Sequence, residues 1–390
     1  MDIFITGAAR TPMGSFQGEL SGLTGPQLGA AAVRAVVARA GVKPEDVDEA
    51  YMGCVLPAGV GQAPARQASI HGGLPNTVPC TTVNKVCGSG MKAMMLAADQ
   101  LRDGGAGVIV AGGMESMTNA PYLLAKARGG FRLGHGEIKD HMFLDGLEDA
   151  YEGRLMGTYA EDAARHYQFT RGEQDGYAIE SLTRAQRAQN DGSFEKEIVA
   201  VAVRAKSGDV AVSTDEQPRK ADPAKIATLK PAFAKDGTVT AANSSSISDG
   251  AAALVLARGD LVAKRSLKPI ARIVAQASNA GEPRWFTTAP VRAIERVLER
   301  AGWKKSDVDL YEINEAFAVV SMIAMRDLSR AHDVVNVNGG ACALGHPIGA
   351  SGARIVVTLI NALERRGLKR GVASLCIGGG EATALAVELV

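Results

Sequence analysis

Two cysteines of this chain stand in sequence settings that suit thiol chemistry. Cys87 lies in the segment VNKVCGSGM, where Gly-Ser-Gly opens a run of good helix formers. A thiol at the start of a helix faces the positive end of the helix dipole, which favours the thiolate. The small residues beside it leave room for a substrate to approach the backbone. The alternative is a buried structural cysteine, a common fate of cysteine in apolar surroundings.

The second thiol, Cys376, ends an apolar segment and precedes the glycines of CIGGG. Strand ends are where open α/β sheets place their ligands. His346 sits in the glycine-dense segment GGACALGHPIGASGAR, and the proline after it stiffens its position. An imidazole on such a loop can serve as the base that activates a thiol. Asn314 directly follows the apolar segment 308–313. The alternatives are a buried strand-end cysteine, a hydrogen-bonded turn histidine and a turn-forming asparagine.

Brought together, these groups would support covalent thioester chemistry. One cysteine would hold an acyl group, while the other would move a proton at a carbon next to a carbonyl. That proton is weakly acidic, so an oxyanion must be stabilised by donors already in place. Backbone N–H groups at Cys87–Gly88 and at Gly378–Gly379 are candidates for these donors.

Composition restricts the remaining classes of function. A chain of 390 residues exceeds the usual size of one core, so two or more packed units are expected. The formal net charge is only +1, which gives no reason to expect nucleic-acid binding. The five cysteines are widely spaced without any CxxC, so we expect neither a disulfide framework nor a metal site. Free thiols of this kind suit a reducing compartment. The N-terminus lacks the pattern of a signal peptide and no apolar run approaches ~20 residues, so a cytoplasmic protein without membrane contact is predicted.

The elements that would position these residues repeat within the chain. Residues 33–48 and 294–309 share a predicted amphipathic helix that ends in the pattern AGxKxxDVD. Farther along, Ser89-Gly90 before one long helix corresponds to Ser351-Gly352 before another, predicted at 353–366. Each of these helices is followed by a short apolar strand ending in glycines, as in a sheet buried on both faces. The sequence therefore predicts two homologous α/β halves, residues 1–118 and 268–390.

Residues 119–248 between the halves differ in composition from both halves and are predicted to form an inserted loop domain. Thr170-Arg171-Gly172-Glu173 is a capping-box pattern that starts a helix reaching about residue 188. The polar segment 213–220 is predicted to be a surface loop. A buried strand within 249–258 is predicted to rejoin the first sheet. Insertions beside a site usually shape the entry of its substrate.

Taken together, the motifs resemble those of the thiolase family, over essentially the whole chain. They are VCGSG around Cys87, GGMESM at 112–117, NEAF at Asn314, the long loop around His346, and CIGGG at Cys376. The resemblance is greatest to the biosynthetic, acetoacetyl-CoA type. It implies two α/β halves packed in an αβαβα arrangement with an inserted loop domain. It also implies a place in fatty acid, polyhydroxyalkanoate or ketone metabolism, and a homotetramer built as a dimer of dimers.

The reaction implied by the resemblance is the ping-pong condensation of two acetyl-CoA molecules to acetoacetyl-CoA, and its reverse. Cys87 would be the nucleophile, His346 would take its proton, and Cys376 would deprotonate the second acetyl-CoA. Asn314 would fix a water that completes one oxyanion hole with His346. The N–H groups of Cys87 and Gly378 would form the other. Coenzyme A thioesters are the implied substrates, and no tightly bound cofactor is implied.

Coenzyme A contacts follow from the resemblance as well. Ser245 matches a serine that contacts pantetheine, and Arg219 matches a basic residue near the nucleotide. Further matches are to pocket-lining positions: Leu147, Met156, Phe233, Ala241 and Phe317. The chain departs from many biosynthetic relatives at Leu155, where they have histidine, and at Ser246 and Ser248 in the serine motif. These departures leave the acyl-chain preference open.

Two other functions are compatible with parts of the pattern. Within the family, the alternative is a degradative 3-ketoacyl-CoA thiolase of broader specificity, including the β-ketoadipyl-CoA type. Outside catalysis, the alternative is a thiolase-fold protein that only binds acyl-CoA or lipid. The joint presence of Cys87, Asn314, His346 and Cys376 argues against the second, because binding alone needs neither two thiols nor a base. The sequence does not set the direction of the reaction, since cleavage and condensation share one mechanism.

Overall fold

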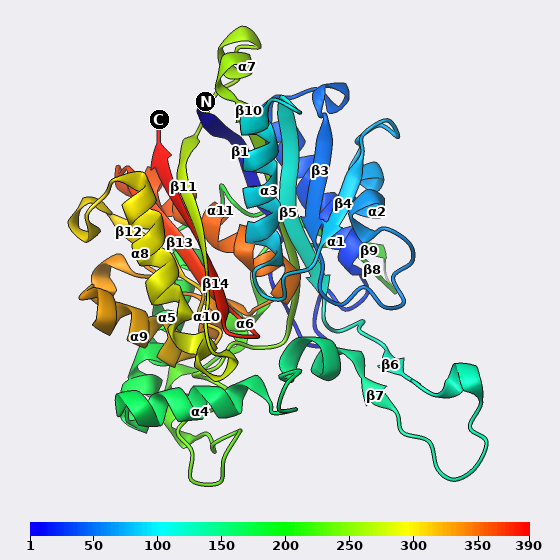
Figure 1. Cartoon of the computed structure of the whole chain (residues 1–390), viewed down its shortest axis with the longest axis vertical. Coiled ribbons are helices and arrows are strands. Elements are labelled where there is room, and N and C mark those ends of the chain that lie inside the picture. The colour runs from blue at the N-terminus through cyan, green and yellow to red at the C-terminus, as the bar shows by residue number, and fades with distance from the viewer. Residues whose placement is uncertain (207) are drawn as a thin grey trace.

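A computed structural model describes residues 1–206 and 208–390, and within them one mixed sheet of ten strands forms the frame (Figure 1). The first half contributes, in spatial order, β4 (Cys80–Val83), β3 (Glu49–Gly53), β5 (Val108–Ser116), β10 (Ser248–Arg258) and β1 (Ile3–Arg10), with β2 (Gly14–Ser15) paired to β10. The second half contributes β11 (Ala271–Ala280), β14 (Glu381–Leu389), β13 (Arg370–Ile377) and β12 (Leu310–Ile313). The halves are joined where β1 and β11 pair antiparallel over three residues each. Strand β10 follows the inserted segment in sequence, yet it pairs with β1 and β5.

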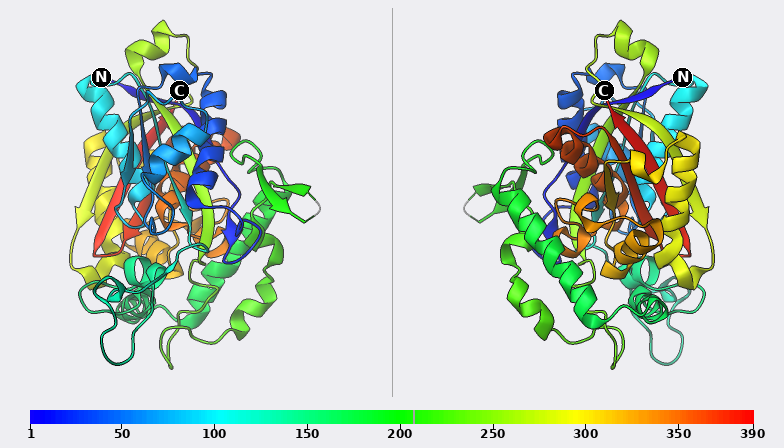
Figure 2. Two further views of the ribbon diagram at one scale, coloured as in Figure 1. Left: turned by 90° about the vertical axis from the view of Figure 1, so that its right-hand side faces the viewer. Right: turned by 90° about the vertical axis from the view of Figure 1, so that its left-hand side faces the viewer.

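Helices cover both outer faces of these strands and also fill the space between the halves (Figures 1 and 2). The outer layers are α1 (Gly25–Ala40) with α2 (Pro64–His71) on the first half, and α8 (Ala289–Ala301) with α9 (Ala318–Leu328) on the second. The inner layer is α3 (Ser89–Asp103) with α11 (Ile348–Arg366), which begins five residues earlier than predicted. Two homologous halves in an αβαβα arrangement are thereby confirmed.

None of the helices in the described residues has the length and apolarity needed to cross a membrane.

The repeated glycines end corresponding helices in the two halves. Gly41 after α1 and Gly302 after α8 both lie in the left-handed region, with φ of 64° and 68°. Gly104 after α3 and Gly367 after α11 do the same, with φ of 84° and 65°. Glycine adopts this conformation without the steric cost that a side chain brings. The duplicated pattern in the sequence is therefore a duplicated set of helix stops.

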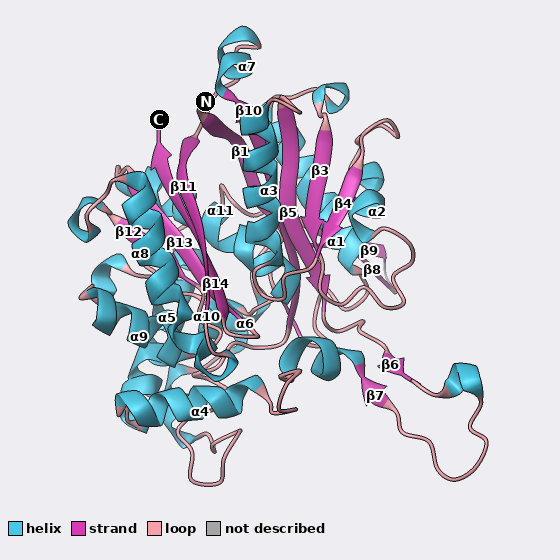
Figure 3. Ribbon diagram, viewed as in Figure 1, coloured by secondary structure: helices cyan, strands magenta, loops and turns pink. Residues whose placement is uncertain are grey.

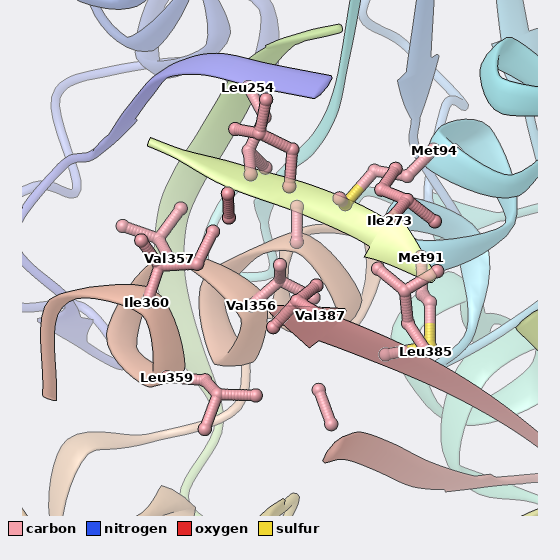
Figure 4. Packing of buried hydrophobic residues seen from close by; sticks show 14 of the residues in the cluster. Met91, Met94, Leu254, Ile273, Val356, Val357, Leu359, Ile360, Leu385 and Val387 are labelled. Atoms are coloured by element: carbon pink, nitrogen blue, oxygen red, sulfur yellow. The ribbon is translucent and has the colours of Figure 1, made fainter. Parts of the chain in front are cut away.

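The inner layer packs through apolar side chains from both halves. Figure 4 shows methionines of α3 meeting aliphatic side chains of α11 and of strands on either side. Those labelled there are Met91, Met94, Leu254, Ile273, Val356, Val357, Leu359, Ile360, Leu385 and Val387. All of them are at most 4% exposed. This shared core holds the two halves as one body, because neither half buries its inner helix alone.

α3 and α11 cross with their backbones in contact near their N-terminal ends, in the first turn of α3 and the second turn of α11. A Cβ on Gly352 would lie 2.4 Å from the backbone nitrogen of Met91. A Cβ on Gly90 would lie 2.9 Å from the backbone nitrogen of Ala353. Only glycine permits this approach. The crossing brings together the loops that precede the two helices.

The inserted segment contains helices, long loops and two small hairpins, one of which forms a long arm (Figures 1 and 3). Its elements are β6 (Tyr122–Leu123), β7 (Lys139–Asp140), α4 (Met156–Tyr167), α5 (Arg171–Asn190), β8 (Val201–Ala205), β9 (Gly208–Val212) and α6 (Glu216–Lys220). Short helices elsewhere are α7 (Gly259–Lys264) and α10 (Ala341–Leu344). Single turns of 3-10 or π helix occupy Pro44–Asp46, Ala127–Gly129, Phe143–Leu147, Pro223–Thr228, Pro283–Thr288, Lys305–Asp307 and His332–Val334. The predicted capping box at Thr170 and Glu173 is present at the start of α5.

The prediction of a surface loop at 213–220 is wrong. This segment contains α6, and the side chains of Asp215 and Glu216 are buried. The fully buried Arg10 of β1 donates to Asp215 at 2.6 Å and to Glu197 at 2.6 Å. Burying a guanidinium requires paired carboxylates, so these acidic residues are buried with it. Polarity alone could not indicate that the partner lies some two hundred residues earlier.

The helix crossing yields a stability prediction. Gly352→Ala should lower the free energy of unfolding by about 1–3 kcal/mol, because the new methyl group collides with the backbone of α3. Gly176→Ala is the matched control: this glycine is exposed within α5 and has open space around its Cβ position. There alanine should raise stability by about 0.5–1 kcal/mol through helix propensity. Thermal denaturation of the three proteins measures both changes, and equal melting temperatures would contradict the close crossing.

Candidate active site

Cys87 is held by a strained turn at the start of α3. The preceding residue, Val86, has φ of 47°, a left-handed conformation that is unusual for a β-branched side chain. Such a residue costs of order 1–3 kcal/mol and persists only where the surroundings enforce it. The hydroxyl of Ser89 enforces it by donating to the Val86 carbonyl at 2.7 Å and accepting from the Lys85 N–H at 2.8 Å. The turn thus fixes the direction of the Cys87 side chain.

The helix start favours the thiolate of Cys87, but burial of the sulfur opposes it. Burial raises the pKa of its thiol to about 11. The backbone N–H groups of Gly378 and of Cys87 itself pull the pKa of this thiol down, but by less. Loss of water around the sulfur therefore outweighs both these donors and the helix start. At neutral pH Cys87 is a thiol that needs a base.

His346 is a buried imidazole whose tautomer follows from its neighbours. Its Nδ1 lies 2.5 Å from the hydroxyl of Ser351, and that hydroxyl donates to the Pro347 carbonyl at 2.9 Å. Since the single hydroxyl proton is used on Pro347, Nδ1 carries the proton and Ser351 accepts it. This leaves the lone pair of Nε2 available. Burial, and then the charge of Arg354, lower the pKa of His346 to about 3, so the ring rests neutral.

Asn314 faces the free nitrogen of that ring. Its Nδ2 lies 3.5 Å from Nε2 of His346. Its Oδ1 lies 3.4 Å from Nη2 of Arg354, which also pairs with Glu312 at 3.1 Å inside the protein. A guanidinium can only donate, so it selects the oxygen end of the amide. Arg354 thereby turns the Asn314 N–H groups toward His346.

Cys376 lies at the end of β13 and is fully buried. Burial, and then the proximity of Cys87, raise the pKa of its thiol well above the ordinary value. Two residues after Cys376, the N–H of Gly378 hydrogen-bonds to the Cys87 sulfur and lowers the pKa of that thiol. Lys85 and Glu381 form an ion pair between the two cysteine-bearing loops. These contacts bring together Cys87, Cys376 and Gly378, as the sequence suggested.

Cys87 also packs against an apolar cluster that reaches the His346 loop. The cluster consists of Val55, Leu56, Met117, Met142 and Ile348, and Leu147 packs against it too. Met156 lies next to Gly378, because its Cε is 3.6 Å from where a Cβ on that glycine would be. The rings of Phe233 and Phe317 meet edge to face at 6.0 Å. Apolar side chains therefore line the approach to the two thiols.

The remaining predicted contact residues lie farther out. Ser245 donates its backbone N–H to the carbonyl of Ala316, within the NEAF motif. Ala241 lines a cavity of about 310 Å³, together with Lys220 and Lys225. Arg219 is instead paired with Glu19 at 2.6 Å, on a half-exposed surface. The two lysines of the cavity are ion-paired as well, Lys220 with Glu216 at 2.5 Å and Lys225 with Asp222 at 4.0 Å.

Three buried residues that support the site were missed by the sequence analysis. Ser351 and Arg354 set the orientation of His346 and Asn314, as described above. Glu115 accepts N–H groups of Val55, Leu56 and Gly349 at 2.9–3.1 Å, and its burial raises the pKa of its carboxyl to about 7. It links the end of β5 to the start of α11. The signal was a charged or hydroxyl side chain inside each glycine-rich motif, where small residues otherwise prevail.

Residues 1–206 and 208–390 contain no cluster of three or more His, Cys, Asp or Glu side chains that could hold a metal ion.

Comparison with known proteins supplies the family. A model of the thiolase N-terminal domain matches residues 3–260, and one of the thiolase C-terminal domain matches residues 267–389.

Curated relatives and a solved structure match the chain over its length. Acetyl-CoA acetyltransferase 2 of Arabidopsis thaliana is 51% identical over 392 residues, covering 100% of this chain and 97% of that protein. Acetyl-CoA acetyltransferase of Cupriavidus necator is 49% identical, covering 99% of each chain. The crystal structure of the Bacillus anthracis acetyl-CoA acetyltransferase superposes with a TM-score of 0.97 at 42% identity, covering 100% of this chain and 99% of that one. The strained cysteine turn, the second buried thiol and the neutral histidine thus belong to a chain of the thiolase family.

Proposed function

We propose that this protein is an acetyl-CoA C-acetyltransferase, which condenses two acetyl-CoA molecules to acetoacetyl-CoA and catalyses the reverse thiolysis. The observation that carries the proposal is the convergence of two thiols in different surroundings. Cys87 is partly accessible on a turn next to the Gly378 N–H, whereas Cys376 is fully buried. One is suited to attack a thioester and the other to act as a base. The names of the relatives support the same activity.

In the first half-reaction Cys87 is acetylated. Its proton passes to Nε2 of His346, and the sulfur attacks the carbonyl carbon of acetyl-CoA. The N–H groups of Cys87 and Gly378 stabilise the oxyanion that forms. The C–S bond to coenzyme A then breaks, and coenzyme A leaves as a thiol by taking the proton of Cys376. The products are acetyl-Cys87, protonated His346 and a Cys376 thiolate.

In the second half-reaction a carbon–carbon bond forms. The Cys376 thiolate removes a methyl proton of the second acetyl-CoA, whose thioester oxygen is held by protonated His346 and a water on Asn314. The resulting carbanion attacks the acetyl carbonyl on Cys87 and releases acetoacetyl-CoA. Cys87 leaves as a thiolate and recovers its proton from His346. Burial of Cys376 suits this step, because a high pKa makes its thiolate a strong base.

Coenzyme A binding is assigned to the inserted segment 119–248. Ser245 lies beside the NEAF motif, and the cavity with Lys220 and Lys225 suits a phosphate-bearing group. Arg219 would reach the nucleotide only after leaving Glu19. Leu147, Met156, Phe233, Ala241 and Phe317 remain assigned to the walls around the pantetheine and acyl group.

A homotetramer in the cytoplasm completes the proposal. The arm that carries β6 and β7 projects from the body of the molecule (Figure 1) and exposes several large apolar side chains, which favours association. They are Tyr122, Leu124, Phe131, Leu133 and Ile138. All five cysteines are free thiols, which supports a reducing compartment.

The roles of the two thiols can be separated by substitution. Cys87→Ala should abolish transfer of radiolabelled acetyl from acetyl-CoA to the protein, because no other thiol is positioned to attack. Cys376→Ser should still take up label at Cys87 but condense about 10²–10⁴-fold more slowly, since its base is lost. Cys80→Ala, a cysteine on the edge strand β4, is the matched control and should behave as wild type. Full labelling of Cys87→Ala, or normal condensation by Cys376→Ser, would exclude the assigned role.

The protonation state of Cys87 predicts its reactivity toward alkylation. With a pKa of about 11, the thiolate fraction rises about tenfold for each pH unit below that value. The rate of iodoacetamide modification at Cys87 should therefore climb steadily from pH 7 to pH 9. Mass spectrometry of the Cys87 peptide measures this rate, with Cys87→Ala as the blank. A plateau below pH 8 would instead indicate a preformed thiolate–imidazolium pair.

Acyl-chain preference distinguishes the proposal from the degradative 3-ketoacyl-CoA and β-ketoadipyl-CoA alternatives. Met156 beside Gly378 and the Phe233–Phe317 pair are bulky side chains that we assign to the end of a short acyl pocket. Thiolysis of acetoacetyl-CoA should exceed that of 3-oxooctanoyl-CoA by at least about tenfold in kcat/KM, since overpacking one side chain costs about 1–3 kcal/mol. Steady-state kinetics on both substrates decide the point. Preference for the longer chain, or for a terminal carboxylate, would overturn the acetoacetyl assignment.

A further inference from the structure

A second concave site lies where the C-terminal ends of α5 and α11 meet, away from the catalytic groups. It is a cavity of about 170 Å³. Its lining residues are Arg187, Asp191, Ser193, Asn338, Ala362, Arg365 and Arg366. α11 has 19 residues, so at about 1.5 Å per residue its last turn lies about 27 Å from its start near His346. The cavity is therefore separate from the proposed active site.

Positive charge is in excess around this cavity. Three guanidinium groups line it against a single carboxylate, Asp191. Burial, and then the positive charges of Arg187 and Arg184, lower the pKa of Arg366, so these cations are close enough to repel one another. Asp191 accepts the N–H and the hydroxyl of Ser193 at 2.9 and 2.5 Å, and lies 3.7 Å from Arg365. One engaged carboxylate does not neutralise three arginines.

Asn338 provides an independent sign of a missing ligand. Its side chain is only 4% exposed and lines the cavity. Across residues 1–206 and 208–390 it makes no side-chain hydrogen bond. Cations at helix C-termini are explained by the helix dipole, but an amide that lines the cavity between them without a hydrogen-bond partner among the described residues is not.

We propose that this cavity binds a small tetrahedral oxyanion, namely phosphate or the phosphate group of a small phosphomonoester. Guanidinium groups present paired N–H donors that match the oxygens of such an anion, and the Asn338 amide would add another. A volume of 170 Å³ equals that of about five or six waters, at about 30 Å³ each. It is below the roughly 300 Å³ at which pockets for drug-sized ligands begin, so whole coenzyme A does not fit.

Binding would connect two parts of the chain. Arg187 belongs to α5 of the inserted segment, whereas Arg365 and Arg366 belong to α11 of the second half. Arg187 already donates to the Val337 carbonyl at 2.7 Å, directly before Asn338. An anion held by both helices would therefore stabilise the folded chain, since it binds only when they are adjacent.

The test is isothermal titration of the full-length protein, prepared without phosphate, with sodium phosphate. Sodium chloride at equal ionic strength serves as the blank. Saturable binding of phosphate and a rise in melting temperature are expected. Arg366→Gln and Asn338→Asp should each weaken phosphate affinity by at least about tenfold, the second by placing a carboxylate against the anion, with acetyltransfer unchanged. Absence of saturable binding to the wild type, or unchanged affinity in both variants, would overturn the proposal.

Additional titrations distinguish binding at this cavity from binding at the cavity with Lys220 and Lys225. They also identify the source of the anion. Lys225→Gln should retain phosphate binding, and saturating coenzyme A should not displace it. Displacement by coenzyme A would place the phosphate at the lysines and overturn the assignment. Glycerol 3-phosphate binding more tightly than inorganic phosphate, with glycerol as its blank, would identify a phosphomonoester as the ligand. Tighter binding of inorganic phosphate would identify the free ion.

Discussion

The site depends on one packing constraint, the contact of the α3 and α11 backbones at Gly90 and Gly352. The crossing lies near the N-terminal ends of both helices, so the loops that enter them also meet. One loop carries Cys87 and the other His346. Because a Cβ at either glycine would collide with backbone rather than with a movable side chain, the helices have no means of adjusting. The relative position of the Cys87 and His346 loops is thus set by the fold, before any hydrogen bond between side chains is considered.

Burial then sets the protonation states. A rise in the pKa of Cys87 from 9.0 to about 11 corresponds to about 3 kcal/mol against the thiolate. A helix start typically contributes only about 0.3–1 kcal/mol in the other direction. The same loss of water keeps His346 neutral. The resting site therefore holds an uncharged thiol and an uncharged imidazole, and charge develops only when substrate brings its carbonyl to the N–H donors. Such a site avoids the cost of burying an ion pair in its resting state.

The sequence could predict what depends on local pattern and on repetition. The glycines that end the helices, the apolar strands and the glycines at the starts of α3 and α11 recur in both halves. This repetition was enough to predict two packed halves. It could not predict what depends on partners distant in the chain. Asp215 looked like a loop residue until Arg10 was seen to be buried against it, and Arg354 looked like an ordinary helix residue until it was found beside Asn314. The raised pKa of the Cys87 thiol could not be predicted from the sequence either, because desolvation is a property of the packed fold.

The two halves also differ in a way that explains why their cysteines are not equivalent. Strand β3 pairs Met52 with Gly112 of β5, and the equivalent strand β12 pairs Ile313 with Ser374 of β13, so Met114 occupies the position of Cys376. The first half fills this position with the longer, fully buried side chain of Met114 and has no thiol there. In the second half the fully buried side chain at this position is the thiol of Cys376. One half therefore supplies a thiol from the helix start and the other a thiol from the strand end. Because these positions differ in access to solvent, the two thiols have different acidities, and this difference is what allows one to attack and the other to serve as base.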